Sequence, residues 1–458
     1  MSAHVSTQTA QPELARDLKV SHAAAVVVGT VIGSGIFLVP SEMMQAVGSA
    51  GLVYLAWIVG GLLSWFGAIS YAEMGAMKPQ AGGEYVYIRD AYGPLGGFLY
   101  GWTYFLIAKP GSIATIVTGL VRILGTFAPL AFLPRVFIRG PITITYGQLV
   151  AVAAIFFITF LNYIGVKRAG EFQLFFTSLK VVIIVGIAVA GFSYAGGSWH
   201  HFSESYSAAT GGFAGFMTAL IAALWAYDGW NLVTTVSAEI REPQRSLPIA
   251  LILGVAIVAI LYMLLNAAVQ YVMSPAAIAA SPRPASDAML LVMGSAGAAI
   301  VSAGMALSML VTLNGSTMTG ARIPFALARD GYFFHSLAKV HPRFHTPSVA
   351  LGVQGVLAIV LVLFAGTFQQ LFSLTLFAEW LFYMLGTAAV FIFRRREPNA
   401  PRPYKTWGYP VVPALFIAAS AILLYYSFMA NWHNSVAGVL VLLAGIPVFA
   451  LFRRRAEA

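Results

Sequence analysis

Long apolar segments alternate with short polar segments along the whole chain. A helix that crosses a bilayer needs about 20 mostly apolar residues, and twelve segments meet this requirement. Their approximate bounds are 21–45, 51–77, 94–124, 145–166, 170–194, 212–238, 248–272, 287–313, 347–365, 370–393, 409–429 and 435–452. The pattern therefore predicts an all-α integral membrane protein with twelve transmembrane helices.

The composition supports this prediction and removes several classes of function. Only 9% of the residues are charged, whereas a soluble domain carries about 25%. The net charge of +10 is compatible with nucleic-acid binding, but the basic residues fall in short clusters between apolar segments and form no stripe. The chain has no cysteine, which excludes disulfides and thiolate metal sites. No cofactor and no metal site are expected.

The distribution of lysine and arginine predicts the orientation of the chain. With both termini in the cytoplasm, 20 of the 26 basic residues lie on the cytoplasmic side. The others lie outside or within spans: Arg122, Arg135, Arg139 and Arg283 outside, Lys109 and Lys180 within spans. Because cytoplasmic loops carry the excess of positive charge, the N-terminal segment 1–20 and the tail 453–458 are predicted to be cytoplasmic. These charges also favour contact with anionic lipid headgroups.

Two of the predicted spans contain residues that disfavour a helix. The first span holds Gly33, Ser34 and Gly35 in "VVVGTVIGSGIFLVP", and each glycine costs a helix about 1 kcal/mol. The sixth span holds Asp228 and Gly229 in "WAYDGWN". Inside hydrocarbon, unwound backbone is tolerated only where it is buried in protein or lines a cavity. Close packing of helices is the alternative explanation for the glycines of the first span.

The pairing of these two breaks predicts a binding site. Interrupted spans at corresponding positions of two halves are typical of transporters built from inverted repeats. The repeats are predicted at residues 21–194 and 212–393, with two additional helices over 409–452. The start of a second half-helix offers free N–H groups and a positive dipole end to a carboxylate. The end of the first half-helix offers free carbonyls to an ammonium, so the two breaks together suit an amino acid zwitterion.

Five ionisable residues fall in predicted spans, where such residues are functional candidates. Glu73 and Lys109 are expected to extend toward the span ends. Lys180 is interpreted as a fixed positive charge, a proton carrier or a structural lysine bonded to carbonyls. Asp228 either contacts a cationic group of the substrate or caps the restarted helix. Glu379 either pairs with a neighbouring helix or carries a proton.

Trp225 and two polar connectors complete the set of candidates. Trp225 directly precedes the second break, so it either closes over a bound substrate or packs in the core or against lipid. The segments 82–94 and 314–347 are amphipathic, and both are expected to lie along the membrane interface, as plain connectors or as gating loops. The apolar residues expected to face the interface in the second segment are Phe325, Leu327, Phe333 and Phe334.

Together these motifs resemble the amino acid–polyamine–organocation superfamily, and most closely its L-type amino acid transporter branch. The resemblance covers about residues 20–430. It is carried by "GTVIGSGIFLVP", "SYAEMGAMKPQAGGEYVYIRDAYGP", "WAYDGWN" followed by "EIREPQRSLPIAL", and the lysine in "FTSLK". The resemblance implies a LeuT-type fold of twelve helices with a 5+5 inverted repeat in which helices 1 and 6 are broken.

The resemblance also implies how the first break contacts the substrate. The substrate carboxylate is expected at the backbone N–H groups of Gly33, Ser34 and Gly35. The substrate ammonium is expected at the carbonyls of Val31 and Ile32.

In the rest of the site, the resemblance implies four further roles. Carbonyls of the sixth helix at Trp225 and Asp228 are expected to contact the ammonium, and Trp225 is expected to gate the site. Asn231 matches a polar residue that supports the site. Lys180 matches a fifth-helix lysine that replaces a sodium ion, which implies sodium-independent transport.

Two departures from the family pattern change what is expected. Animal light subunits use a cysteine to join a heavy chain, and this chain has none. A disulfide-linked heavy subunit is therefore excluded, which favours a stand-alone bacterial protein. Asp228 stands where several transporters of neutral amino acids have Gly or Ser, whereas members that also accept cationic amino acids share its motif. The sequence therefore leaves both neutral and cationic amino acids as possible substrates.

The sequence thus predicts an exchanger of neutral amino acids in a bacterial inner membrane, working by alternating access without sodium. Within this class, the alternatives are exchange of cationic amino acids and proton-coupled symport with Lys180 or Glu379 as the titrating group. From other classes, the alternatives are a channel, which the paired broken helices disfavour, a membrane enzyme, for which no reactive cluster is present, and a non-transporting sensor. The expected partners are an amino acid and membrane lipid, and the oligomeric state stays open.

Overall fold

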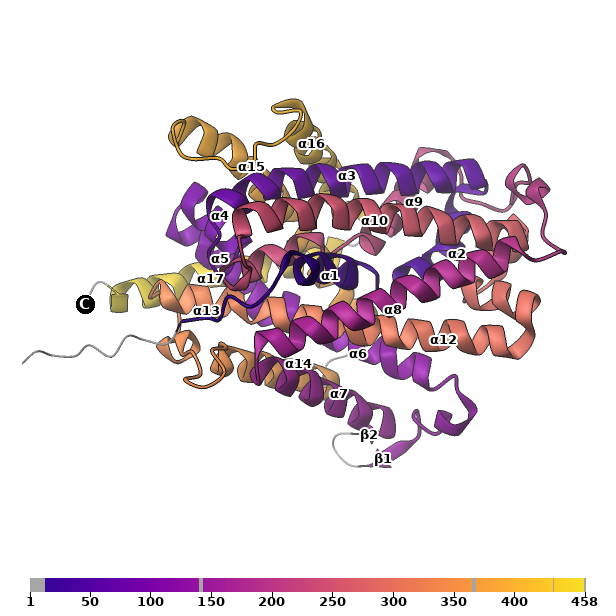
Figure 1. Ribbon diagram of the computed structural model, residues 1–458, viewed down its shortest axis with the longest axis horizontal. Coiled ribbons are helices and arrows are strands. Elements are labelled where there is room, and N and C mark those ends of the chain that lie inside the picture. Colours follow the sequence, from indigo (N-terminus) through magenta and orange to yellow (C-terminus); the bar gives the residue numbers. More distant parts are fainter. Residues whose placement is uncertain (1–12, 140–142, 365–367, 431, 457–458) are drawn as a thin grey trace, which may run out of the picture.

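The computed structural model describes residues 13–139, 143–364, 368–430 and 432–456. Long helices run side by side along one direction and form a single bundle (Figure 1). Residues 1–12 of the predicted N-terminal segment and residues 457–458 of the predicted tail lie outside the described residues. The broken first span consists of α1 (Val20–Val31) and α2 (Gly35–Val47), which meet at a bend of 40°.

The remaining elements follow in two runs along the chain. The first run consists of α3 (Ala50–Met77), α4 (Glu84–Tyr92), α5 (Pro94–Thr103), the π-helix η1 (Tyr104–Ala108), α6 (Lys109–Leu124), the 3₁₀ turn η2 (Ala128–Leu130), the antiparallel strands β1 (Val136–Ile138) and β2 (Ile144–Thr145), α7 (Tyr146–Tyr163) and α8 (Val166–Phe192). The second consists of η3 (Trp199–Phe202), α9 (Gly212–Ala226), the 3₁₀ helix η4 (Trp230–Glu239), α10 (Pro243–Val272), α11 (Pro275–Ala280), α12 (Pro284–Gly320), α13 (Arg322–Arg329), η5 (His335–Ala338), α14 (Ser348–Phe364), α15 (Phe368–Arg396), α16 (Val411–Ala430) and α17 (Trp432–Ala456).

The all-α membrane architecture predicted from the sequence is confirmed. Among the described residues, eight helices are long and apolar enough to cross a membrane, or nine if α1 and α2 count as one span. The other three predicted spans correspond to α9 with η4, to the shorter α14, and to α15. The count of twelve spans and the inverted repeat therefore stay predictions.

The predicted break in the sixth span has a specific local structure. Helix α9 ends at Ala226, and the chain turns at Gly229, whose φ of 98° favours glycine. It then continues as the ten-residue 3₁₀ helix η4, although 3₁₀ runs longer than about four residues are uncommon. Side-chain hydroxyls of η4 donate to carbonyls three residues back, from Thr234 to Asn231 and from Thr235 to Leu232, each at 2.8 Å. These bonds compensate for the weaker backbone geometry of a 3₁₀ helix.

A second irregularity lies in the third span, at η1. Pro110 has no backbone N–H, and the N–H of Lys109 reaches back five residues to the carbonyl of Tyr104. Such π-bulges inside α-helices occur frequently at functional sites. The bulge places Lys109 in the middle of the continuous apolar segment Pro94–Leu124.

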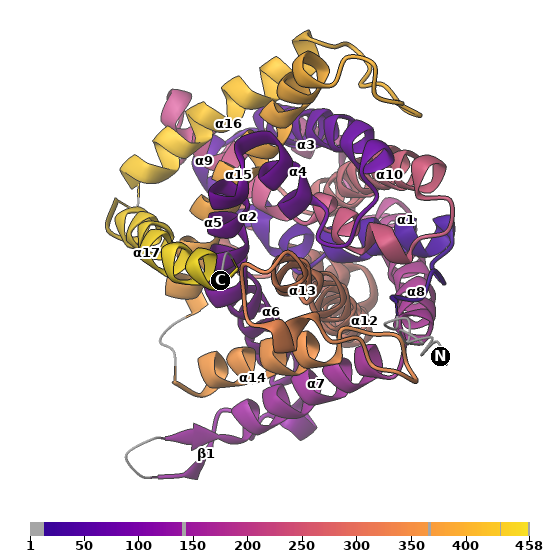
Figure 2. The ribbon, with the colours of Figure 1, turned by 90° about the vertical axis from the view of Figure 1, so that its left-hand side faces the viewer.

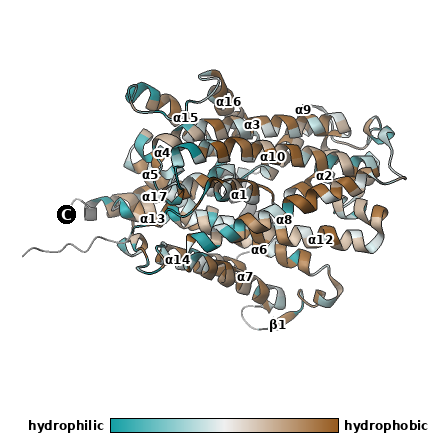
Figure 3. Ribbon diagram, viewed as in Figure 1, coloured by the Kyte–Doolittle hydropathy of each residue, from teal (hydrophilic) through white to brown (hydrophobic). Residues whose placement is uncertain are grey.

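The helices surround the two broken spans. Helix α1 packs against α8, α10 and α12, while α2 packs against α9. Helices α16 and α17 lie at the periphery against α3, α5 and α15, as the end-on view shows (Figure 2). Hydrophobic residues cover most of the helix lengths, and hydrophilic residues gather at the end of the bundle that carries α4 and α13 (Figure 3). The breaks in α1/α2 and α9/η4 are therefore enclosed by protein.

The apolar side chains of the two amphipathic connectors were wrongly expected to face the membrane interface. The segment 82–94 forms α4, in which Tyr85 and Tyr87 are fully buried. In the segment 314–347, Phe325, Leu327 and Phe333 are buried, and only Phe334 of the four predicted interface residues is exposed.

The predicted end of the eighth span at residue 313 is also wrong, because α12 continues to Gly320. The polar residues of this continuation bond within the bundle. Asn314 donates to the carbonyl of Ala169 at 3.1 Å and to Gln173 Oε1 at 2.8 Å, and it accepts from Asn162 Nδ2 at 2.8 Å. Partners on neighbouring helices therefore allow a run that reads as a polar loop to stay helical and buried.

Candidate functional site

The first break places two unpaired N–H groups at a cavity. Between α1 and α2, the N–H of Gly33 donates to the carbonyl of Val31 at 2.8 Å. Within the described residues, the N–H groups of Ser34 and Gly35 have no hydrogen-bond partner. Gly33, Ser34 and Gly35 all line a cavity of about 120 Å³.

The two predicted glycines at this break have different surroundings. A Cβ added to Gly33 would have only Thr312 Oγ1 nearby, at 3.9 Å, so its side-chain direction opens into the cavity. A Cβ added to Gly35 would lie 3.1 Å from Ala226 Cβ and 3.2 Å from Ala226 Cα. Gly35 therefore allows α2 to pack closely against the end of α9, whereas Gly33 leaves space for a ligand.

The carbonyls at the end of α1 are not equally available. Val31 lines the cavity, and its carbonyl lies 3.0 Å from the hydroxyl of Tyr262. The carbonyl of Ile32 accepts from Lys180 at 2.6 Å, Ser308 at 2.7 Å and Thr312 at 3.3 Å. Ile32 is fully buried and is not among the residues that line the cavity. Of the two carbonyls predicted for the ammonium, only that of Val31 belongs to a cavity-lining residue.

Lys180 occupies a cluster of oxygen atoms beside the first break. Its ammonium donates to the carbonyls of Gly29 at 3.0 Å and Ile32 at 2.6 Å. The hydroxyl oxygen of Thr312 lies 3.1 Å and 3.3 Å from the same two carbonyl oxygens. Carbonyls at the end of a half-helix together with hydroxyls form the type of environment in which transporters coordinate a sodium ion. In this structure the Lys180 ammonium lies within such a cluster.

Two residues that the sequence analysis missed connect the broken spans. The hydroxyl of Tyr262, in α10, lies 3.0 Å from the carbonyl of Val31 and 2.7 Å from that of Ala226. The hydroxyl oxygen of Thr30 lies 3.1 Å from the carbonyl oxygen of Gly229. Each contact joins one break to the other across the bundle. A lone tyrosine or threonine in an apolar span gives no sequence signal of such a role.

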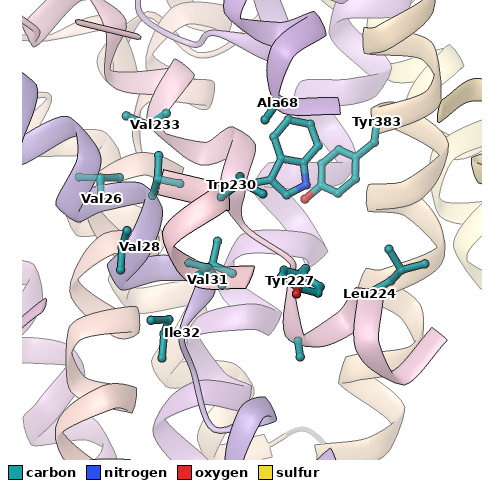
Figure 4. Packing of buried hydrophobic residues seen from close by; sticks show 14 of the residues in the cluster. Val26, Val28, Val31, Ile32, Ala68, Leu224, Tyr227, Trp230, Val233 and Tyr383 are labelled. Atoms are coloured by element: carbon teal, nitrogen blue, oxygen red, sulfur yellow. The ribbon is translucent and has the colours of Figure 1, made fainter. Parts of the chain in front are cut away.

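Aromatic residues pack around the second break. In the close view, Trp230 lies close to Tyr383 (Figure 4). The rings of Trp230 and Tyr383 are 5.6 Å apart, and those of Tyr227 and Tyr262 are 5.0 Å apart. Trp225, the predicted gate, lines the cavity. Fixed aromatic groups therefore hold the end of α9 and the start of η4 in position.

Asn231 supports the site from behind rather than lining the cavity. It is fully buried, and its Nδ2 donates to Glu84 Oε2 at 2.6 Å. Tyr71 donates to Glu84 Oε1 at 2.6 Å, and Tyr100 lies 3.4 Å from Oε2. Glu84 thus connects η4 to α3 and α5 from the start of α4. Sequence analysis missed it because its segment was assigned to the interface.

The glycines before Glu84 explain how α4 reaches η4. The N–H of Gly82 donates to the carbonyl of Thr235 at 2.9 Å. A Cβ on Gly83 would lie 2.3 Å from the carbonyl carbon of Thr234, and Gly83 has a φ of 46°. The sequence "GGE" therefore gives both the close approach of the two backbones and the burial of Glu84.

The buried carboxyl of Glu84 makes stability depend on pH. Burial raises its pKa to about 7 from the ordinary 4.5, against the hydrogen bonds of Tyr71 and Asn231. Because the folded state then binds more protons than the unfolded state, this group lowers stability as pH rises through that window. In Glu84→Gln this pH-dependent loss of stability disappears. The thermal midpoint of the variant, minus that of the wild type, should therefore rise between about pH 5 and about pH 8. Thermal unfolding in detergent measures this difference, and a difference independent of pH would contradict the assignment.

The other intramembrane charges are paired, and Lys109 was wrongly placed by the sequence pattern. Glu73, expected to extend toward a span end, is buried near the end of α3 and accepts from Arg394 at 2.7 Å and Arg402 at 3.2 Å. Lys109 was expected to do the same, but it lines the cavity and lies 3.6 Å from Glu379 Oε1. Asp228 also lines the cavity and accepts from the hydroxyl of Tyr383 at 2.8 Å.

Comparison with known proteins fits this arrangement. The family model described as amino acid permease matches residues 18–452. The chain is 31% identical over 447 residues to the serine/threonine exchanger SteT of Bacillus subtilis, covering 96% of this chain and 98% of that protein. It is 30% identical to the b(0,+)-type amino acid transporter 1 of Mus musculus, covering 98% and 90% of the two chains. It is also 30% identical to the human cystine/glutamate transporter, covering 96% and 86%.

These matches span nearly the whole chain and include both broken spans. The relatives transport or exchange amino acids, and none is an enzyme. With the helical membrane fold and the paired breaks, they establish that this chain is an amino acid transporter and a member of the amino acid permease family, within the amino acid–polyamine–organocation superfamily.

Proposed function

We propose that the protein exchanges amino acids across a bacterial plasma membrane, one molecule in for one out, by alternating access and without sodium. The observation that carries this proposal is the pair of free N–H groups of Ser34 and Gly35 at a cavity that Val31 also lines. The N–H groups bind the substrate carboxylate, aided by the helix dipole of α2. The carbonyl of Val31 and the end of α9 bind its ammonium. The two repeats, residues 21–194 and 212–393, move relative to each other around this site.

Independence from sodium follows from the position of Lys180. Its ammonium occupies the carbonyl and hydroxyl cluster that would otherwise coordinate the ion. A fixed positive charge leaves no place for a sodium ion to bind or release during the transport cycle. The same charge holds the end of α1 in both directions of exchange.

Neutral amino acids are the first choice of substrate. Much of the cavity lining is apolar and includes Ile116, Leu232 and Met309. Cationic amino acids are the second choice, because Asp228 and Glu379 line the same cavity. Proton-coupled symport is the competing mechanism, and the same two carboxyl groups favour it.

Transport by purified protein in liposomes separates exchange from symport. Thermal-shift screening of the twenty amino acids identifies ligands, and labelled ligand is then supplied to liposomes that are empty or loaded with the same amino acid. We expect uptake to be strongly stimulated by internal amino acid and unchanged when sodium is replaced by choline. Uptake that needs a proton gradient and ignores internal substrate would reject exchange.

The proposed orientation places both termini in the cytoplasm. Because the chain contains no cysteine, a single introduced cysteine reports topology without background labelling. Ser207→Cys, exposed between α8 and α9, should react in intact cells with a membrane-impermeant maleimide. Ser336→Cys, exposed in η5, should react only after the cells are broken. The reverse labelling pattern would invert the proposed topology.

A further inference from the structure

Three charged side chains meet at one wall of the cavity. Lys109 in α6, Asp228 between α9 and η4, and Glu379 in α15 all line it. Lys109 Nζ lies 3.6 Å from Glu379 Oε1, and both side chains are about 95% buried, with exposures of 4% and 5%. Asp228 accepts a hydrogen bond from Tyr383, which lies one helical turn after Glu379 in α15. Two carboxyl groups and one ammonium therefore lie close together at the cavity, inside the bundle.

Two ionised carboxyl groups beside one ammonium would leave a net negative charge inside the bundle. An uncompensated charge is costly inside a membrane protein, so one proton on the two carboxyl groups is favoured. Neighbouring carboxylates also resist ionising together, because like charges at close range repel. With one shared proton, the pair carries a single negative charge, which the ammonium of Lys109 balances. The loaded cavity can then hold a neutral amino acid without an uncompensated charge.

The net charge at this wall depends on Lys109, Asp228 and Glu379, because the neighbouring groups are neutral or are bonded to other partners. Tyr383 in α15 donates to Asp228, and the ring of Tyr104 in η1 lies 5.1 Å below the Lys109 ammonium. Glu84 in α4 is the next carboxyl group; it is not among the residues that line the cavity, and it is bonded by Tyr71, Tyr100 and Asn231. Lys180 is bonded to carbonyls of α1 beside the first break. The shared proton is therefore the charge at this wall that a ligand can replace.

We propose that the Asp228–Glu379 pair holds one proton while a neutral amino acid is bound, and that the charged side chain of a cationic amino acid displaces this proton. The proposal rests on the proposed exchange function and goes beyond it. A neutral zwitterion with the protonated pair has the same charge as a cationic amino acid with the deprotonated pair. The displaced proton passes to water, and no bond other than its O–H bond changes. Exchange of a cationic for a neutral amino acid thus moves one proton in the direction of the neutral substrate and no net charge.

Proton release on binding tests this proposal directly. Purified wild-type protein is titrated with L-lysine and with each neutral amino acid found by thermal shift, in buffers of different ionisation enthalpy. Isothermal titration calorimetry then gives the number of protons released. We expect close to one proton per bound lysine and none per neutral amino acid. Lysine binding without proton release, or a failure of lysine to bind while neutral amino acids bind, would overturn the proposal and leave exchange intact.

A variant locates the effect at Glu379. Glu379→Gln keeps the size of the side chain but removes the exchangeable proton, so lysine should bind about 30-fold or more weakly. Neutral amino acids should lose much less affinity than lysine does, and residual lysine binding should release no proton. Glu42→Gln, which removes an exposed carboxylate from α2 outside the cavity, is the matched control and should behave as wild type. Unchanged proton release on lysine binding to Glu379→Gln would overturn the proposal. If the variant does not fold, the number of protons released by the wild type decides the proposal. Absence of any bound amino acid would instead reject the proposed function itself.

Discussion

Replacing Gly33 with leucine is expected to abolish amino acid binding while leaving the protein folded. The added side chain enters open space, since its Cβ would have only Thr312 Oγ1 nearby, at 3.9 Å. It would fill the cavity beside the free N–H groups of Ser34 and Gly35, where the carboxylate is proposed to bind. Binding should weaken by at least about 100-fold, which corresponds to about 2.8 kcal/mol.

Thermal-shift and counterflow measurements on Gly33→Leu test this result. Gly186→Leu is the matched control, because Gly186 is exposed on α8 and an added Cβ there meets nothing within 4 Å. The control should bind and exchange as the wild type does. Gly33→Leu that binds with unchanged affinity would remove the first break from the substrate site.

Replacing Lys180 with alanine is expected to have the second large effect. The ammonium makes two charge-assisted hydrogen bonds to carbonyls of α1, each worth about 1.5–3 kcal/mol. Without it, the carbonyl cluster loses its cation and the end of α1 loses its fixed position. Exchange should fall by at least about 100-fold, because about 3 kcal/mol or more is removed from the site.

Proteoliposome exchange measures the effect of Lys180→Ala. Lys167→Ala serves as the control on the same helix, since Lys167 is exposed near the start of α8. Lys167→Ala removes one lysine charge but neither of the two hydrogen bonds to α1. This control should therefore keep wild-type exchange. Full exchange by Lys180→Ala would show that the ammonium has no role in transport.

Sequence alone predicted the positions of both breaks closely. Gly33, Ser34 and Gly229 lie where the helices α1, α2 and α9 end or begin. These positions were predictable because glycine lowers helix propensity locally, whatever the rest of the chain does. The apolar spans were predictable because a segment inside a bilayer must pair its backbone groups within its own helix, so a long apolar run predicts a helix.

Sequence did not predict contacts between residues that are far apart in the chain. Lys109 and Glu379 meet only because the π-bulge of η1 and the helix α15 are both packed beside the cavity. Burial of α4 was missed because an amphipathic helix has the same pattern whether its apolar face meets lipid or protein. The continuation of α12 was missed because the polar partners of Asn314 come from α7 and α8.

Recognition of both charged ends of an amino acid is the central claim, and competition with modified substrates tests it most directly. Counterflow of the best neutral amino acid is measured in the presence of the same compound, its methyl ester or its decarboxylated amine. The ester lacks the charge proposed to meet Ser34 and Gly35, and the amine lacks the whole carboxyl group. We predict that only the unmodified amino acid competes at concentrations near its own affinity. Equal competition by the decarboxylated amine would contradict binding of the substrate carboxylate at the first break.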